Sequence, residues 1–102
     1  MSADSRHPAF GATTAIIAVV AGRVQGVGFR YSTHDVAVKM GIVGWVRNRL
    51  DGTVEVWAQG PDDPVTAFAR YLETGPRAAR VRSVVVAEVE PDPTLRGFDI
   101  RY

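Results

Sequence analysis

A glycine-rich segment, Gly22–Arg30 (GRVQGVGFR), holds residue types that suit a small phosphate dianion. Its three glycines permit positive φ, so successive backbone N–H groups can turn toward one point. Arg30 adds a permanent charge, and its planar guanidinium matches two phosphate oxygens. The segment also leads into a predicted helix, whose first N–H groups are unpaired and partly positive. These features predict a phosphate-binding loop.

Other phosphate-binding motifs do not fit this segment. No Gly-Lys-Ser or Gly-Lys-Thr follows the glycines, so the loop is not of the Walker type. Tyr31 stands where a dinucleotide fingerprint needs its third glycine, so a nucleotide is not favoured either. On residue types alone, a plain strand-to-helix turn remains the alternative.

A second segment, Gly44–Asn48 (GWVRN), is followed by Asp51–Glu55 (DGTVE) and holds the other candidate. Asn48 falls at the end of a predicted strand, just before a turn. Its amide can donate one hydrogen bond and accept another, which is what orienting a water molecule requires. The alternative is that Asn48 only supports the turn, a common use of asparagine.

The apolar pattern predicts the elements that must position these residues. A β-branched, apolar run near the start predicts a central strand, and Asp51-Gly52 between two strand-like runs predicts a hairpin. Gly41 is placed to end the first helix, and Pro61–Pro64 to begin the second with an aspartate cap. The expected order is a strand at 13–21, a helix at 29–40, strands at 42–48 and 53–59, a helix from 61 to 75, and strands at 81–90 and 97–102.

This order is the split β-α-β-β-α-β unit. We expect an α+β, ferredoxin-like sandwich, with two helices on one face of a mainly antiparallel sheet and an extra short C-terminal strand. Residues 13–102 form this domain in the prediction. Residues 1–12 are small and polar without periodicity, and they are expected to form a flexible N-terminal arm.

Composition limits the other classes of function. The chain has 102 residues, enough for one domain, and a formal net charge of +1. It has no cysteine, and its two histidines, His7 and His34, are too few for a metal site built on imidazole. The longest apolar run, Ala15–Ala21, is much shorter than the about 20 residues of a membrane span. We therefore expect a cytoplasmic protein with no metal and no membrane partner.

The predicted topology also occurs in RNA-recognition modules, which stack bases on exposed aromatic side chains. The first predicted strand, Thr14–Val20, has no aromatic residue, and the net charge is near zero, so we expect no nucleic-acid partner. Trp45 and Trp57 are best explained by core packing or contact across the hairpin. Nothing specific favours an oligomer, and a monomer is expected.

Together the two segments resemble the signatures of the acylphosphatase family. Gly22–Arg30 matches that family's phosphate-loop signature, and Gly44–Asn48 with Asp51–Glu55 matches its second signature. The similarity runs from about Thr14 to Tyr102, behind an N-terminal arm longer than is typical of the family. It implies that Arg30 binds phosphate and that Asn48 positions the attacking water. The substrate-binding residues expected on this basis are Gln25, Gly26, Val27, Gly28, Phe29 and Arg30.

The resemblance implies hydrolysis of small acyl phosphates to a carboxylate and inorganic phosphate, without metal or cofactor. The family acts on compounds such as acetyl phosphate, carbamoyl phosphate and bisphosphoglycerate-type acyl phosphates. The leaving carboxylate has a conjugate acid with a pKa of about 4, so no strong general acid is needed. The resemblance suggests that a phosphate oxygen takes the water's proton. The protein bases that would replace it are His34, Asp51 and Glu55. A module that binds phosphate or carbamoyl phosphate without turnover is the alternative function.

Overall fold

Five strands and two helices make up residues 13–102, the part of the chain that the computed structural model describes. The predicted arm, residues 1–12, lies outside the described residues. The elements are β1 (Thr13–Arg23), α1 (Phe29–Lys39), β2 (Val43–Asn48), β3 (Val54–Pro61), α2 (Asp62–Thr74), β4 (Arg80–Val89) and β5 (Phe98–Arg101).

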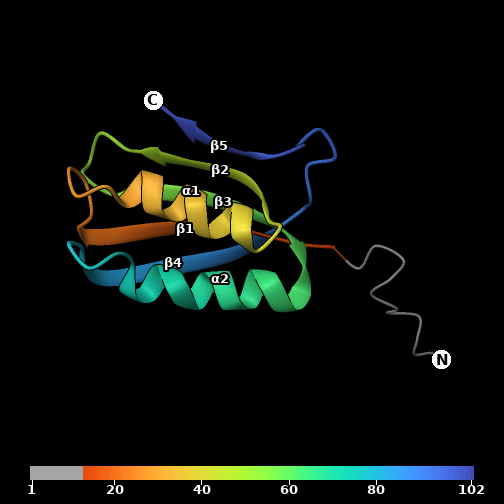
Figure 1. Ribbon diagram of the computed structural model, residues 1–102, viewed down its shortest axis with the longest axis horizontal. Coiled ribbons are helices and arrows are strands. Elements are labelled where there is room, and N and C mark those ends of the chain that lie inside the picture. The colour runs from red at the N-terminus through yellow and green to blue at the C-terminus, as the bar shows by residue number, and fades with distance from the viewer. Residues whose placement is uncertain (1–12) are drawn as a thin grey trace.

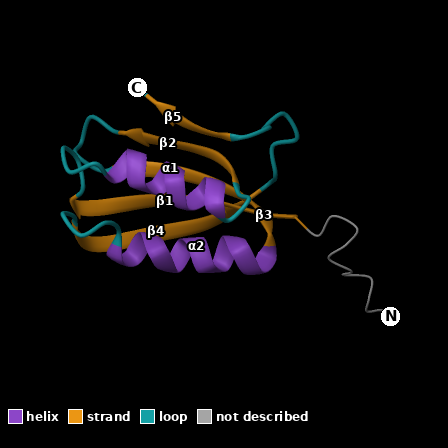
Figure 2. Ribbon diagram, viewed as in Figure 1, coloured by secondary structure: helices purple, strands orange, loops and turns teal. Residues whose placement is uncertain are grey.

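The strands form one sheet in the order β4-β1-β3-β2-β5. Neighbouring strands run antiparallel, except that β5 pairs parallel with β2. Both helices cover the same face of this sheet (Figures 1 and 2). The predicted ferredoxin-like sandwich with its additional C-terminal strand is therefore confirmed.

The core lies between the sheet and the two helices. Alternate side chains of β1 point toward the helices, because successive residues of a strand face opposite sides. Ile16, Ala18 and Val20 are buried in this way, in one core cluster with Phe68 of α2. The largest fully buried side chains of this core are Phe29, Phe68, Leu72, Val20, Val24, Val46, Val54, Val56 and Val65.

The start of α2 differs from the prediction in one respect. The expected aspartate cap is absent, since Pro61 occupies the N-cap position and no side chain caps the helix there. The reason is that β3 extends to Pro61, which places Asp62 inside the first helical turn. The Asp62 carboxylate instead accepts a hydrogen bond from Thr14 Oγ1 at 3.1 Å.

Close packing at the end of β1 explains the first glycine of the loop. The pairing of β1 with β4 shifts register between Ala21 and Gly22, the sign of a β-bulge. Gly22 has φ +131°, and a Cβ there would lie 2.1 Å from the carbonyl oxygen of Arg80. Only glycine fits this approach, and beyond it the chain leaves the sheet toward α1.

The elements that carry the two motifs meet at one end of the sheet. The loop from β1 to α1 and the turn from β2 to β3 lie at this end, beside the last residues of β5 (Figure 1). On the face without helices, Trp45 and Trp57 stack across the β2–β3 hairpin at 6.2 Å between ring centroids. This is one of the two contacts predicted for them. No helix between residues 13 and 102 has the length and apolar character needed to cross a bilayer.

Candidate active site

A cavity of about 160 Å³ lies where the two motifs meet. It brings together Arg30, from the first turn of α1, and Asn48, the last residue of β2. At about 30 Å³ for each water molecule, it has room for a tetrahedral anion and a water. The residues that line it are Val24, Gly26, Gly28, Phe29, Arg30, Tyr31 and Asn48.

The loop needs glycine for its backbone conformation. Gly26 and Gly28 have φ of +75° and +76°, in the left-handed region that side chains disfavour. A Cβ at either position would meet no atom within 4 Å, so space is not the reason. The two left-handed residues turn the loop so that its backbone curves around the cavity.

The first turn of α1 offers unpaired donors to the cavity. The first backbone bond of the helix runs from the Ser32 N–H to the Gly28 carbonyl, so the N–H groups of residues 29–31 have no acceptor within the helix. Gly28 supplies no capping side chain, and no acidic residue lies in the first turn. The positive end of the helix is therefore free to attract an anion.

Arg30 is held in place by the end of the chain. Its Nη1 donates to the carbonyl oxygen of Arg101 at 3.1 Å, and its guanidinium lies 4.8 Å from the ring centroid of Tyr102. Within residues 13–102, no carboxylate forms an ion pair with it. The guanidinium thus keeps its full charge beside the cavity while its direction is restricted.

Tyr102 is itself held by a hydrogen bond to the first helix. Its hydroxyl lies 2.9 Å from that of Tyr31, which lines the cavity. This hydrogen bond, with some desolvation, raises the pKa of Tyr102 above its ordinary value, although the charge of Arg30 acts in the opposite direction. Tyr102 therefore stays neutral at physiological pH. The residue patterns gave no indication of this contact between the first helix and the chain end.

Asn48 presents an unused acceptor. Its Oδ1 is buried and has no hydrogen-bond partner among the described residues. A buried acceptor without a partner costs about 1–3 kcal/mol of stability. The arrangement suits an acceptor that is completed by a molecule bound in the cavity.

The turn after β2 is held by Asp51 and not by the Asn48 side chain. Asp51 Oδ1 accepts hydrogen bonds from Thr53 Oγ1 at 2.6 Å and from the Thr53 N–H at 3.0 Å. These bonds, with the charge of Arg49, lower the pKa of the Asp51 carboxyl. Hydrogen bonds within this turn are thus made by Asp51, three residues beyond Asn48.

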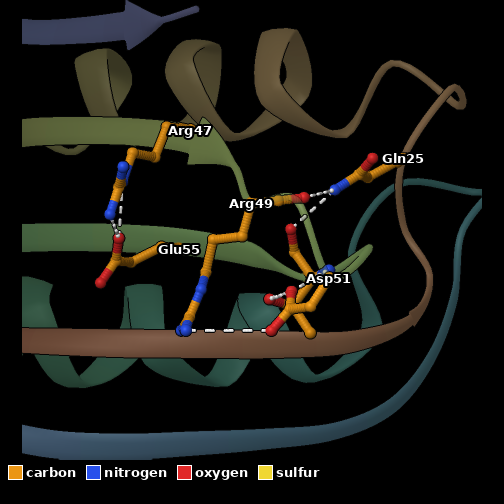
Figure 3. A network of polar contacts seen from close by, with 6 residues as sticks. Gln25, Arg47, Arg49, Asp51 and Glu55 are labelled. Atoms are coloured by element: carbon orange, nitrogen blue, oxygen red, sulfur yellow. Dashed lines mark hydrogen bonds and ion pairs between the residues drawn. The ribbon is translucent and has the colours of Figure 1, made fainter.

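Gln25 ties the Gly22–Arg30 loop to the β2–β3 turn (Figure 3). Its Nε2 donates to the carbonyl oxygens of Arg49 at 2.8 Å and Thr53 at 2.9 Å. Gln25 and Val27 are the two predicted binding residues that do not line the cavity, and Val27 packs against the core. Any contact that these two residues make with the anion through their backbone N–H groups stays a prediction.

For the acyl phosphate hydrolysis that the sequence resemblance implies, replacing Gln25 with alanine is expected to lower kcat about tenfold. The change in KM should be smaller. The loss of both donors lets the loop move relative to Asn48, and small misplacements of reacting groups reduce rates strongly. The free energy of unfolding should fall by about 1–3 kcal/mol. Steady-state kinetics and urea denaturation measure the two effects.

Gln25→Glu is the matched control, because it keeps the side-chain size but replaces the donors with a carboxylate facing two carbonyls. It should lose as much activity as Gln25→Ala. Full activity in Gln25→Glu would mean that the side chain contributes by volume alone.

None of the three candidate bases lines the cavity. His34 Nδ1 lies 3.1 Å from Asp35 Oδ1, and its ring packs edge-on against Phe98. Glu55 is paired at 2.6 Å with Arg47 across the hairpin, as Figure 3 shows.

No group of three or more metal-ligating side chains is present within residues 13–102.

A second, shallower hollow of about 460 Å³ adjoins the first at Asn48. It lies over the β2–β3 turn, between Leu50, which is fully exposed, and Tyr102. Arg47 and Arg49 line it, and each of them is paired with a carboxylate, Glu55 and Asp51 respectively. The sequence contained no signal for a hollow at this position, because it depends on how the turn and the chain end face each other.

Comparison with known proteins identifies relatives over most of the chain. A model of the acylphosphatase family matches residues 16–100. An acylphosphatase of Pseudomonas paraeruginosa is 54% identical over 84 residues, which cover 82% of this chain and 91% of that protein.

Solved structures agree with this result. The crystal structure of acylphosphatase from Bacillus subtilis superposes with a TM-score of 0.83 at 37% identity, over 87% of this chain and 99% of that one. An acylphosphatase structure from Coxiella burnetii gives a TM-score of 0.81 at 36% identity, over 87% and 93% of the two chains. The similarity therefore covers both motifs and nearly all of the described sheet.

Proposed function

Because the chain belongs to the acylphosphatase family, we propose that its cavity is the active site, with Arg30 and the Gly22–Arg30 loop binding the phosphoryl group and Asn48 positioning water. The enzyme hydrolyses the carboxyl–phosphate bond of acyl phosphates, giving a carboxylate and inorganic phosphate. The observation that carries the residue roles is that Arg30 and the unpartnered Asn48 Oδ1 lie on one cavity.

The phosphoryl group sits in the curved loop in this proposal. The N–H groups of residues 29–31 and the guanidinium of Arg30 donate to its non-bridging oxygens. These oxygens keep most of the negative charge in the loose transition state of phosphoryl transfer, so fixed donors stabilise that state. The hydrogen bond from Arg30 to Arg101 holds the guanidinium in direction before substrate arrives.

Water attacks phosphorus from the side of Asn48. The Oδ1 atom accepts a hydrogen bond from one O–H of the water. This bond orients the water so that a lone pair of the water oxygen points at phosphorus. A new P–O bond forms to the water oxygen while the P–O bond to the acyl oxygen breaks. The acyl oxygen leaves as a carboxylate, whose conjugate acid has a pKa of about 4, so it departs without a proton.

The water's proton passes to a phosphate oxygen in this mechanism. His34→Ala, Asp51→Asn and Glu55→Gln are therefore each expected to keep kcat within about threefold of wild type, whereas loss of a true general base costs about 10²–10⁴. The pH profile of kcat/KM should also be unchanged in the three variants. A large loss in any one of them would assign the proton to that side chain.

The acyl group leaves from the side of phosphorus opposite the water, because the attacking and leaving oxygens lie roughly in line. It therefore points away from Asn48 and from the second hollow beside it. No cofactor takes part in the proposed reaction, and the departure of a stable carboxylate leaves no step that needs a metal ion. The absence of a nucleic-acid or membrane partner and the cytoplasmic location remain predictions.

The test is hydrolysis of benzoyl phosphate by the purified protein in the presence of excess chelator. Wild type should turn over, Arg30→Ala and Asn48→Ala should be severely impaired, and Arg70→Ala should match wild type. Arg70 is an exposed arginine on α2 away from the cavity, so it controls for loss of a positive charge. A folded wild-type protein that binds phosphate without turnover would instead be a binding module.

A further inference from the structure

The strand β4 forms one outer edge of the sheet. Within residues 13–102 it pairs only with β1, so the backbone N–H and C=O groups on its other side have no strand partner. Figure 1 shows β4 at one edge of the sheet and β5 at the opposite edge. Unpaired edges of this kind are templates for another strand.

This edge is apolar on both faces at its centre. Val85 is 67% exposed and Val86 is 47% exposed. Val85 pairs with Val19 and lies on the face without helices, whereas Val86 pairs with Ala18 on the helix-covered face. Edge strands are usually protected by central charges or by proline, and this one has neither in its middle.

The charges on β4 are arranged symmetrically about Val85. The sequence from 80 to 90 reads RVRSVVVAEVE, with arginine at 80 and 82 and glutamate at 88 and 90. When two copies of this segment run antiparallel and cross at Val85, each of these arginines lies opposite a glutamate. The smaller residues also correspond, with Val84 opposite Val86 and Ser83 opposite Ala87.

We propose that β4 pairs antiparallel with β4 of a second copy of this chain, around a two-fold axis at Val85. The two sheets then join into one, and the same surface serves both subunits. Val85 packs against the partner's Val85, and Arg82 forms an ion pair with the partner's Glu88. This inference goes beyond the proposed function, and it extends the monomer expected from the sequence to a concentration-dependent equilibrium.

The pair of Arg82 with the partner's Glu88 determines the register in which the two strands pair. Arg82 and Glu88 are both exposed, and neither has an ion-pair partner within the described residues. Arg80 is less available, because its Nη1 already donates to the carbonyl oxygens of Arg77 and Ala79. The register shift in the pairing with β1 places a bulge at Arg82, which limits the regular new ladder to residues 83–87. Arg82 and the partner's Glu88 therefore meet just beyond each end of this ladder.

A ladder of this length makes a small interface, so the dimer should form at micromolar to millimolar concentration and not more tightly. The cavity is unaffected, because none of its lining residues belongs to β4. Hydrolysis per chain should therefore be the same at low and high protein concentration.

Charge reversal tests the proposal by sedimentation equilibrium of the full chain. Arg82→Glu places two glutamates opposite each other at both ends of the ladder, and Glu88→Arg does the same with two arginines. Like charges brought together at the ends of the ladder destabilise the strand pair. Each single variant should weaken self-association about tenfold relative to wild type, because the two-fold axis repeats the changed pair at both ends.

Two further samples separate pairing from a general loss of association. An equimolar mixture of Arg82→Glu and Glu88→Arg restores opposite charges at both ends, so it should form heterodimers. The double variant Arg82→Glu/Glu88→Arg should self-associate like wild type. Unchanged melting temperature and unchanged benzoyl phosphate hydrolysis show that each variant is folded.

Three outcomes would overturn the pairing. These are a wild-type protein that stays monomeric at millimolar concentration, single variants that associate as wild type does, and a mixture that associates no more than its components. None of these outcomes bears on the proposed active site, which the kinetic variants test separately.

Discussion

Replacing Arg30 with alanine is expected to lower kcat/KM for benzoyl phosphate by about 10³-fold, since an arginine on a transferring phosphoryl group contributes on this scale. The guanidinium has no carboxylate partner within residues 13–102, so its whole charge is available to the substrate. Its hydrogen bond to Arg101 and its contact with the Tyr102 ring mean that little reorganisation precedes the reaction. Steady-state kinetics measure the loss.

Measuring the binding of inorganic phosphate distinguishes the contribution of the Arg30 charge from that of its planar guanidinium. Arg30→Ala should weaken phosphate binding by about 10- to 100-fold, as expected for one charge-assisted hydrogen bond. Arg30→Lys keeps the charge but loses the planar fork, so it should recover part of the phosphate affinity and little of kcat. Full rescue by lysine would show that charge alone is needed, and an Arg30→Ala variant with normal kcat/KM would remove Arg30 from the site.

Asn48→Ala is expected to lower kcat by about 10²–10³, with a much smaller effect on KM. The group lost orients the attacking water and does not hold the phosphoryl group, so binding depends on the loop that remains. Single-turnover kinetics with benzoyl phosphate distinguish a slower chemical step from slower product release.

The stability of the same variant gives an independent readout. Asn48 Oδ1 is buried without a partner, and removing it relieves that cost, so unfolding free energy should stay constant or rise by about 1 kcal/mol. A residue kept for the turn would behave in the opposite way and destabilise the fold on truncation. A loss of stability together with normal kcat would therefore return Asn48 to a structural role.

The secondary structure was accessible from the sequence because its signals are local. The apolar run of β1, the Asp51-Gly52 turn and the apolar stripe of α2 each fix an element within a few residues. The predicted aspartate cap of α2 is wrong because strand β3 continues to Pro61. The pairing of β3 with β1 across the sheet sets that boundary.

The two motifs of the candidate site could each be predicted from the sequence, but only as separate segments. Residue types alone suggested an anion-binding loop and an amide at a strand end, and the resemblance to a family joined them. The contact that restricts Arg30 could not be found in this way, because Arg101 lies 71 residues further along the chain. The tie from Gln25 to Arg49 and Thr53 was also missed, since no local pattern relates a loop glutamine to a distant turn.

The strand order has a consequence for how quickly the site can arise during folding. The interior strand β1 pairs with β3 and β4, and both lie far along the chain. Pairing over such distances requires closure of long loops before any stabilising contact is gained, which slows folding relative to helical proteins of similar size. The loop after β1 faces Asn48 only when β1 and β2 have both paired with β3, so the cavity cannot form before these three strands have assembled.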